Sequence, residues 1–321
     1  MNSPKRKIFE FGKLSATGVV DLQVNGYLGM SYSDPELTEA SFLDASEKLL
    51  KRGVDLFLPT VITSPDEHYQ RNLPRLSEWI EHPRLGGRLP GLHLEGPFLS
   101  PSPGAIGAHR ADWAQPPSPA ALDKLQKWAR GTIRLLTVAA DSPGVTELIR
   151  HATEMGIVVS VGHHLADERQ LNAAAEAGAR LLTHLGNGVP NQVSRHENPI
   201  WAGLACDALT AMVIPDGHHL PASLLKIFLR VKGADRILAT SDQSSVAGMP
   251  PGRYSALGND AILEPNGKLH NPSLQCLVGS AMTLPECVER WPAGFDVDPG
   301  TLRKMTRTNA LRILGMEDSA P

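Results

Sequence analysis

Residues 91–98 read GLHLEGPF, and residues 156–163 read GIVVSVGH. Each stretch is a short apolar run that leads into a residue able to do chemistry, Glu95 in the first and His163 in the second. Near-continuous apolarity over so few residues is typical of strands buried on both faces. Together with six similar runs, these two predict eight strands, at 18–26, 54–63, 90–96, 133–141, 156–163, 180–186, 210–216 and 236–242.

The stretches between these runs show apolar residues at helical spacing. Two of them begin with good N-cap residues, Thr38 and Asp167. Alternating strands and helices imply parallel pairing through right-handed crossovers. Eight such units, with no GxGxxG turn after the first strand, favour an α/β TIM (β/α)₈ barrel over an open doubly wound sheet. We expect the barrel at 18–315, a short segment at 1–17 and a tail at 316–321.

Composition limits the classes of protein to consider. The net charge is -3, with 41% hydrophobic residues, and no basic stripe indicates nucleic acid. The three cysteines are scattered and give no disulfide framework. The first residues lack the apolar core of a secretory signal, and no run approaches the 18 or so apolar residues of a membrane helix. We expect a cytoplasmic enzyme that binds neither membrane nor nucleic acid.

Three long segments rich in Pro, Gly and polar residues follow predicted strands, at 97–117, 187–200 and 243–275. They are too long for plain connections between a strand and a helix. Because each begins at the C-terminal end of a strand, we expect all three over the mouth of the barrel. Long loops at that position usually shape a substrate pocket.

Glu95, His163 and His184 stand at the ends of three different predicted strands, which a barrel brings together at one mouth. Two imidazoles and one carboxylate suit Zn²⁺ with one position left for water. Each residue alone also has an ordinary reading, as a loop cap, an ion-pair partner or a structural histidine. His93, inside its strand, and His164, one residue past its strand, are expected not to be ligands.

Asp242 ends the eighth run and could be a turn aspartate or the general base and acid of a hydrolysis. His109, in the phrase GAIGAH, could donate a hydrogen bond to a developing oxyanion or to a substrate hydroxyl, and the alternative is an exposed loop residue. His219 and Arg195 lie in loops after the seventh and sixth strands. They are candidates for substrate contacts, and the alternative for each is an exposed loop residue.

Taken in order, the phrases of this chain resemble those of the N-acetylglucosamine-6-phosphate deacetylase family of the amidohydrolase superfamily. The resemblance spans residues 18–315. The matching phrases are GVVDLQVNG (18–26), LPTVITS (58–64), GLHLEGPFL (91–99), GAIGAH (104–109), VGHHLAD (161–167), THLGNG (183–188), DGHHLP (216–221), SDQSSVAG (241–248), GSAMTL (279–284) and TNALRILG (308–315).

The resemblance implies a role for each candidate residue. Glu95, His163 and His184 would hold the metal. Asp242 would move the proton, and His109 would polarise the substrate carbonyl. The implied substrate contacts include an arginine that reaches across a homodimer interface, and they are Asn187, Gly188, Arg195, His219 and Leu277.

This chain also departs from the superfamily pattern. Gln23-Val24-Asn25 replaces the usual HxH of the first strand, so we expect one divalent ion per chain, Zn²⁺ first, with Fe²⁺ or another divalent ion as the alternative. Only 17 residues precede the first strand and six follow Gly315, so the family's small β-sandwich should be largely absent. The loop around Arg195 is reshaped, which affects the implied phosphate site.

The expected function is therefore metal-dependent removal of the acetyl group from an amino sugar, foremost N-acetylglucosamine-6-phosphate. One alternative is a related hydrolase acting on a non-phosphorylated N-acyl sugar or an N-acyl amino acid, because fold alone does not fix the substrate. A more distant alternative is a non-catalytic barrel used as a binding protein.

Overall fold

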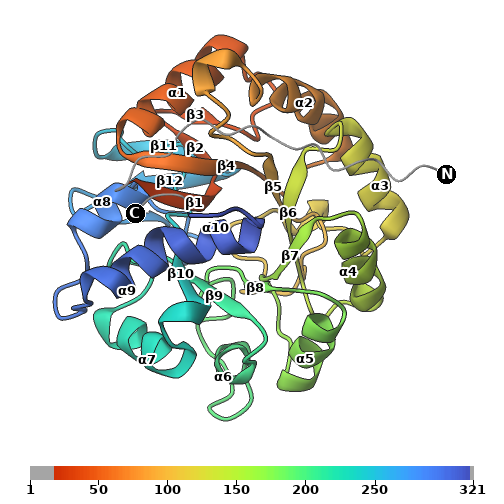
Figure 1. Cartoon of the computed structure of the whole chain (residues 1–321), viewed down its shortest axis with the longest axis vertical. Helices are drawn as coiled ribbons and strands as arrows, with labels where there is room; N and C mark the ends of the chain where they lie inside the picture. Colours follow the sequence, from red (N-terminus) through yellow and green to blue (C-terminus); the bar gives the residue numbers. More distant parts are fainter. Residues whose placement is uncertain (1–17, 319–321) are drawn as a thin grey trace.

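The computed structural model describes residues 18–318, which contain the predicted eight-stranded parallel barrel. The strands pair in sequence order and form a ring, and the helices lie outside it (Figure 1). The barrel strands are β1 (Val19–Val24), β4 (Val54–Ile62), β5 (Leu92–Glu95), β6 (Ile133–Val138), β7 (Val158–Val161), β8 (Leu181–Leu182), β9 (Thr210–Val213) and β10 (Ile237–Ala239).

The ring is nearly closed between its first and last strands. The link is made by Gln243, just beyond β10, which forms parallel bridges with Val24 and with Ser280. The backbone N–H of Asn25 also donates to the carbonyl of Gln243 at 2.8 Å. These bonds bring the C-terminal end of β1 beside the loop that follows β10.

The predicted helices are present, and both predicted caps are confirmed. Thr38 and Asp167 each form a capping box, before α1 and α5 respectively. The helices are α1 (Glu39–Lys51), α2 (Asp66–Trp79), α3 (Pro119–Trp128), α4 (Val145–Glu154), α5 (Glu168–Glu176), α6 (Pro199–Ala205), α7 (Ala222–Lys232), α8 (Leu284–Glu289), α9 (Pro299–Arg303) and α10 (Asn309–Leu314). Shorter turns are the 3₁₀ helices η1 (Pro83–Leu85), η2 (Ala111–Trp113) and η3 (Ala234–Arg236) and the π-helix η4 (Lys304–Thr308).

The helix α10 closes the end of the barrel at which the strands begin. It crosses in front of the strands in Figure 1, and the apolar cluster beneath it joins its side chains to those of six strands. Just before it, the buried Arg307 donates to the carbonyl of Gly18 at 2.6 Å and to Asp55 at 2.9 Å. The opposite end of the barrel, at the C-terminal ends of the strands, carries the candidate site. The apolar cluster beneath α10 comprises Val20, Leu22, Leu56, Leu58, Leu135, Leu181, Met212, Leu238, Ala310, Leu311 and Leu314.

The segment predicted as a long loop at 243–275 contains three of the four strands of a small antiparallel sheet, so that part of the prediction was wrong. Its strands are β11 (Gly252–Ala256), β12 (Asn259–Leu263), β13 (Leu269–Asn271) and β14 (Cys276–Leu277). A two-stranded hairpin, β2 (Gly26–Tyr27) with β3 (Met30–Ser31), follows β1. Within residues 18–318 no β-sandwich built from the two ends of the range accompanies the barrel.

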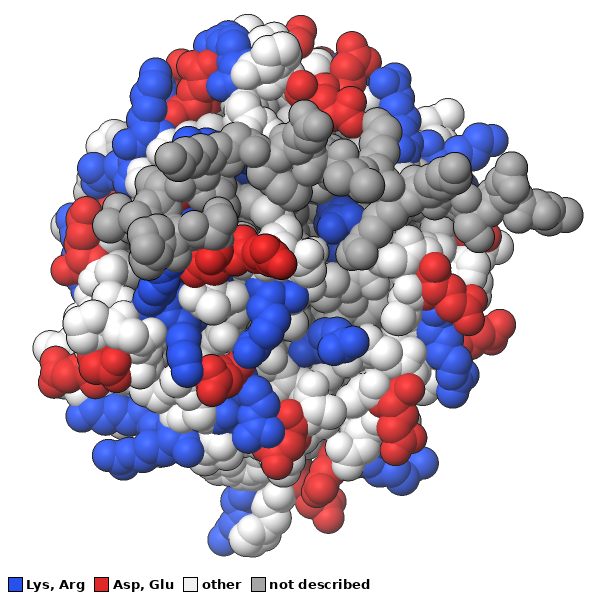
Figure 2. All heavy atoms as spheres, viewed as in Figure 1, with Lys and Arg blue, Asp and Glu red and all other residues white. Residues whose placement is uncertain are grey.

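The predicted segment 1–17 and the last residues of the predicted tail, 319–321, lie outside the described residues. Of the rest of the tail, Asp318 bonds to Arg307 and to Thr308. In the described part of the chain, no helix has both the length and the apolar character needed to cross a bilayer. On the face that carries α10, Figure 2 shows acidic and basic side chains next to one another over the part drawn in colour.

Candidate metal centre and active site

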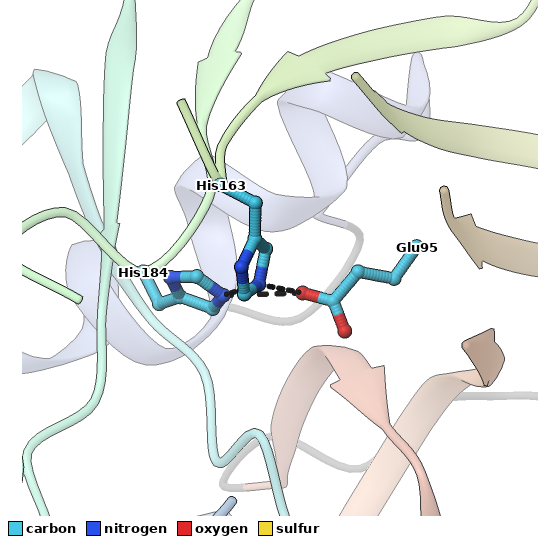
Figure 3. Close-up of side chains that lie close together, drawn as sticks. All are labelled: Glu95, His163 and His184. Atoms are coloured by element: carbon cyan, nitrogen blue, oxygen red, sulfur yellow. Dashed lines mark hydrogen bonds and ion pairs between the residues drawn. The ribbon is translucent and has the colours of Figure 1, made fainter. Parts of the chain in front are cut away.

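Three side chains, from the end of β5 and from the turns after β7 and β8, point at one another in Figure 3. The Nε2 atom of His184 lies 3.1 Å from Oε1 of Glu95 and 3.0 Å from Nε2 of His163. The Nε2 atom of His163 lies 3.3 Å from the same carboxylate oxygen. All three residues are buried. The three predicted metal ligands therefore form one cluster.

The spacing of these atoms fits a shared cation. Tetrahedral ligands about 2.0–2.1 Å from Zn²⁺ stand roughly 3.3 Å from one another, and the three measured separations are 3.0, 3.1 and 3.3 Å. The Nδ1 atom of His163 lies 2.8 Å from the carbonyl of Ala105, which can only accept. The hydrogen of His163 is therefore on Nδ1, and the lone pair of Nε2 faces the cluster.

Glu95 is the last residue of β5, but the other two cluster members and Asp242 lie beyond their strands. His163 and His184 come two residues after β7 and β8, and Asp242 comes three residues after β10. Their φ angles are +52°, +30° and +47°, which makes them three of the seven non-glycine residues with positive φ among those described. Such angles are costly for L-residues and cannot continue a strand, which is why the predicted strands are too long at this end.

Gln23 joins the cluster to Asp242. Its Nε2 donates to Oε1 of Glu95 at 2.8 Å and to Oδ1 of Asp242 at 2.9 Å. Asn25 donates to the same Asp242 oxygen at 2.8 Å. The amide oxygens of Gln23 and Asn25 are buried and have no hydrogen-bond partner among the described residues. The pair of amides that stands in place of HxH thus lies at the barrel mouth and binds the two carboxylates.

Charge and burial set the protonation of these carboxylates in opposite ways. Burial raises the pKa of Glu95, but the adjacent imidazoles of His109, His163 and His184 outweigh it and hold that pKa well below its usual range. For Asp242, burial and the nearby charge of Glu95 raise the pKa to about 7, although His184, His219 and Asn25 oppose the rise. The two acidic groups of the site therefore differ in basicity, as carboxylates with different tasks do.

His109 reaches the cluster from the loop that follows β5. Its Nε2 lies 3.5 Å from Oε2 of Glu95, and its ring centroid lies 4.5 Å from that of His163 at an angle of 85°. Its side chain is 6% exposed. The histidine predicted to polarise a carbonyl is therefore beside the candidate metal ligands.

The two histidines predicted not to be ligands do not join the cluster. Nε2 of His93 lies 2.8 Å from Oγ1 of Thr137, and its Nδ1 lies 3.1 Å from the carbonyl of Leu22. Burial lowers the pKa of His93 to about 4 and that of His164 to about 3. Nδ1 of His164 accepts from the N–H of Ala166. Both are neutral histidines fixed by local bonds.

The predicted substrate contacts are spread around the mouth. Gly188 lies directly against the candidate ligand His163, because a Cβ at this glycine would lie 3.0 Å from Nδ1 of that ring. Asn187 donates to the carbonyl of His184. These two loop residues therefore border the candidate metal ligands.

The other three predicted contacts are less tightly tied to the cluster. The side chain of His219 is only 5% exposed, and its Nδ1 lies 2.8 Å from Oδ2 of Asp216. Burial lowers the pKa of His219, but Asp216 and Asp242 outweigh this effect and raise it. Arg195 is exposed, and its guanidinium makes no hydrogen bond or ion pair within residues 18–318. Leu277 ends β14 and is half-buried.

Sequence reasoning missed two residues that support the site. Asp216, from the phrase DGHHLP, accepts from the backbone N–H groups of His218 and His219 as well as from the ring of His219. Asp21 is fully buried in β1 and accepts from Thr240 at 2.6 Å and from the N–H of Ser241 at 3.2 Å, just before Asp242. The available signal was a carboxylate inside an otherwise apolar run, which is costly unless it is bonded.

Comparisons with known proteins agree with this geometry. No protein-family model matches the chain. The chain is 30% identical over 304 residues to the N-acetylglucosamine-6-phosphate deacetylase of Bacillus subtilis (strain 168), covering 94% of this chain and 75% of that one. It is 28% identical to the N-acetylgalactosamine-6-phosphate deacetylase of Escherichia coli O157:H7, covering 95% and 79%.

A solved structure of another deacetylase is similar to this chain in fold. It is an aspartate-to-alanine variant of the Mycobacterium smegmatis N-acetyl-D-glucosamine-6-phosphate deacetylase in complex with N-acetyl-D-glucosamine-6-phosphate. Its TM-score is 0.84 at 25% identity, and the match covers 94% of this chain and 77% of that one. Identity and fold thus agree over nearly the whole length of this chain, which belongs to the N-acetylglucosamine-6-phosphate deacetylase family.

Proposed function

We propose that this protein hydrolyses the N-acetyl amide of an amino sugar 6-phosphate, releasing acetate and the free amine. The observation that carries this proposal is the convergence of Glu95, His163 and His184 on one point, with Asp242 joined to them through Gln23. We propose that these three residues hold one divalent ion, most simply Zn²⁺, because two imidazoles and a carboxylate leave one position for water. Fe²⁺ or another divalent ion is the alternative.

A divalent ion bound there would lower the pKa of a water molecule and polarise the acetyl carbonyl. Asp242 takes the proton from the attacking water as the new C–O bond forms. It then returns that proton to the amide nitrogen as the C–N bond breaks. A pKa raised by burial suits a carboxylate that must both accept and give up a proton.

The neighbouring side chains keep these groups in place. Gln23 and Asn25 both donate to Oδ1 of Asp242, which leaves its other carboxylate oxygen for proton transfer. His109 donates from Nε2 to the carbonyl oxygen as negative charge develops on it. Its present neighbour, Oε2 of Glu95 at 3.5 Å, marks the position that this nitrogen faces.

For the substrate phosphate we propose His219, the loop at Asn187 and Gly188, and Arg195. Leu277, at the end of β14, would border the sugar. Asp216 and Asp242 raise the pKa of His219 against the effect of burial, which favours the charged form of its ring. Arg195 is exposed on its loop, so we propose that it serves the site of a second copy of this chain in a homodimer.

The substitution Arg195→Ala tests this role. It should reduce kcat/KM on the phosphorylated sugar by about 1.5–3 kcal/mol, as for a charged hydrogen bond, and should change it little on the free sugar. Equal losses on both substrates would show that Arg195 does not read the phosphate.

The relatives leave the sugar open, since one is a glucosamine enzyme and another a galactosamine enzyme. The deciding experiment is acetate release from both N-acetyl hexosamine 6-phosphates, the free N-acetyl hexosamines and an N-acetyl amino acid. We expect a phosphosugar to have the highest kcat/KM. Preference for an uncharged or amino-acid substrate would favour the alternative hydrolase, and no turnover of any substrate by metal-loaded protein would favour a binding role. We propose a cytoplasmic location, which fractionation of cells would test.

A further inference from the structure

The backbone segment 104–110 touches the candidate metal centre twice. The carbonyl of Ala105 lies 2.8 Å from Nδ1 of His163 and orients that ligand. Four residues later, His109 places its Nε2 3.5 Å from Oε2 of Glu95. Displacement at Ala105 would therefore disturb a candidate metal ligand, whereas displacement at Ala108 would move the proposed carbonyl-polarising group.

The ring of His109 is not held in place by its second nitrogen. Its Nδ1 is buried and has no hydrogen-bond partner among the described residues. The backbone N–H of His109 donates to the carbonyl of Ile106, which is part of the same segment. Contacts between this segment and the rest of the molecule must therefore set the position of the ring.

The hairpin of β11 and β12 supplies such a contact. The side-chain amide of Asn259 donates to the carbonyl of Ala108 at 2.6 Å and to the carbonyl of Leu257 at 2.9 Å. Asn271, on the next strand of the small sheet, donates to Oδ1 of Asn259 at 3.4 Å. The bond from Asn271 thus orients the side-chain amide of Asn259, and that amide bonds to Ala108, the residue just before His109.

The turn of this hairpin is shaped to reach the segment. Ala256 pairs with Asn259, so the turn has only two residues, Leu257 and Gly258, with φ of +49° and +73°. Such a turn favours Gly or Asn at both positions, and a leucine with positive φ is strained there. The side chain of Leu257 packs with Ala108 against the apolar core of the small sheet, which compensates for the strain.

We propose that Asn259 is a positioning residue that anchors segment 104–110 and thereby holds His109 over the metal centre. The role of His109 in this inference rests on the proposed function. The bond from Asn259 to the carbonyl of Ala108 does not depend on that function. Asn259→Asp removes the amide donor with little change in shape and places a carboxylate against a carbonyl oxygen. Asp260→Asn is the matched control, because this exposed neighbour lies on the same strand.

The first measurement is hydrogen–deuterium exchange in the metal-loaded, full-length protein. Amides of 105–110 should exchange faster in Asn259→Asp than in the wild type, and should be unchanged in Asp260→Asn. Unchanged exchange in Asn259→Asp, or the same acceleration in the control, would overturn the anchor. This readout does not depend on turnover.

The second measurement is a double-mutant cycle with His109→Asn. Asn259→Asp should lower kcat by about 10- to 100-fold with metal content and KM little changed, since small misplacements of catalytic groups have effects of this size. The double variant should be no slower than His109→Asn alone. If the kcat losses of the two single variants multiplied in the double variant, the proposal that Asn259 acts through His109 would be overturned. Full kcat in His109→Asn would instead overturn the proposed role of that histidine, while the exchange rates still decide the anchor.

Discussion

Gly188 offers a test of how closely the loop after β8 fits the metal site. In Gly188→Ala the new Cβ would lie 3.0 Å from Nδ1 of His163, against at least 3.4 Å for an ordinary contact. The ring must therefore shift by about 0.4 Å, which disturbs its 2.8 Å bond to the carbonyl of Ala105. Gly188 also has φ +62°, where alanine costs roughly 1–2 kcal/mol.

Gly86→Ala separates the two effects. Gly86 has φ +57°, but a Cβ there would have nothing within 4 Å. Both variants should lose about 1–2 kcal/mol of unfolding free energy in the metal-free state. Only Gly188→Ala should also bind metal more weakly, by about 10- to 100-fold, as happens when the group that orients a ligand is disturbed.

The assay is competition for Zn²⁺ with a chelator of known affinity, together with urea unfolding of the metal-free proteins. Wild-type metal affinity in Gly188→Ala would refute the reasoning that this glycine is required by His163. Equal weakening in Gly86→Ala would show that general destabilisation, and not contact with the ligand, is responsible.

Three further predictions concern other parts of the molecule. Asp242→Asn should lower kcat by about 10²–10⁴-fold while metal content stays the same, as steady-state kinetics and metal analysis would show. Arg307→Leu breaks the buried ion pair with Asp55, although Arg88 remains 3.3 Å from that carboxylate, so it should cost at most about 3–5 kcal/mol in urea unfolding while metal affinity, set at the other end of the barrel, is unchanged. The ion pair of Asp216 and His219 should stabilise the fold only within a window of pH. The lowered pKa of Asp216 stabilises the fold above the unfolded aspartate pKa of 3.8, and the raised pKa of His219 does so most fully below the unfolded histidine pKa of 6.5. The unfolding free energy lost in His219→Gln should therefore be greatest at about pH 5 and should shrink as pH rises through the raised histidine pKa; a loss that grows toward pH 9 would contradict this.

The barrel and the metal cluster could be predicted because both follow from strong rules. Short runs buried on both faces, separated by amphipathic helices, leave few topologies. Parallel strands in a barrel end at one mouth, so Glu95, His163 and His184 had to approach one another once the runs were recognised. The capping residues Thr38 and Asp167 were predictable because their bonds are local.

The exact ends of the strands could not be predicted, because apolarity continues past them. The run at 180–186 contains a strand of only two residues, Leu181–Leu182, and a turn at 183–186 follows it. His184 in this run and Asp242 at the end of the run at 236–242 have positive φ. No sequence pattern distinguishes such non-glycine residues from strand residues. Tertiary contacts hold these angles, as with the bonds from Asp21 to Thr240 and Ser241.

The small sheet at 252–277 was missed for a related reason. Its first hairpin turns through Leu257-Gly258, which lacks the Asn-Gly or Asp-Gly signal that identifies such turns in a sequence. The hydrogen bonds by which Gln23 joins Glu95 to Asp242 could not be predicted either. The irregular pairing of β1 between Asp21 and Val24 helps to set where the Gln23 side chain points.

The most direct test of the central claim is to titrate Zn²⁺ into metal-free protein while measuring acetate release from N-acetylglucosamine-6-phosphate and from its galactosamine epimer. The three-residue cluster predicts no release without metal, a linear rise on at least one of the two substrates, and a break at one equivalent per chain. Release that needs no metal, a break at two equivalents, or no release from either sugar phosphate at any metal concentration would contradict the account.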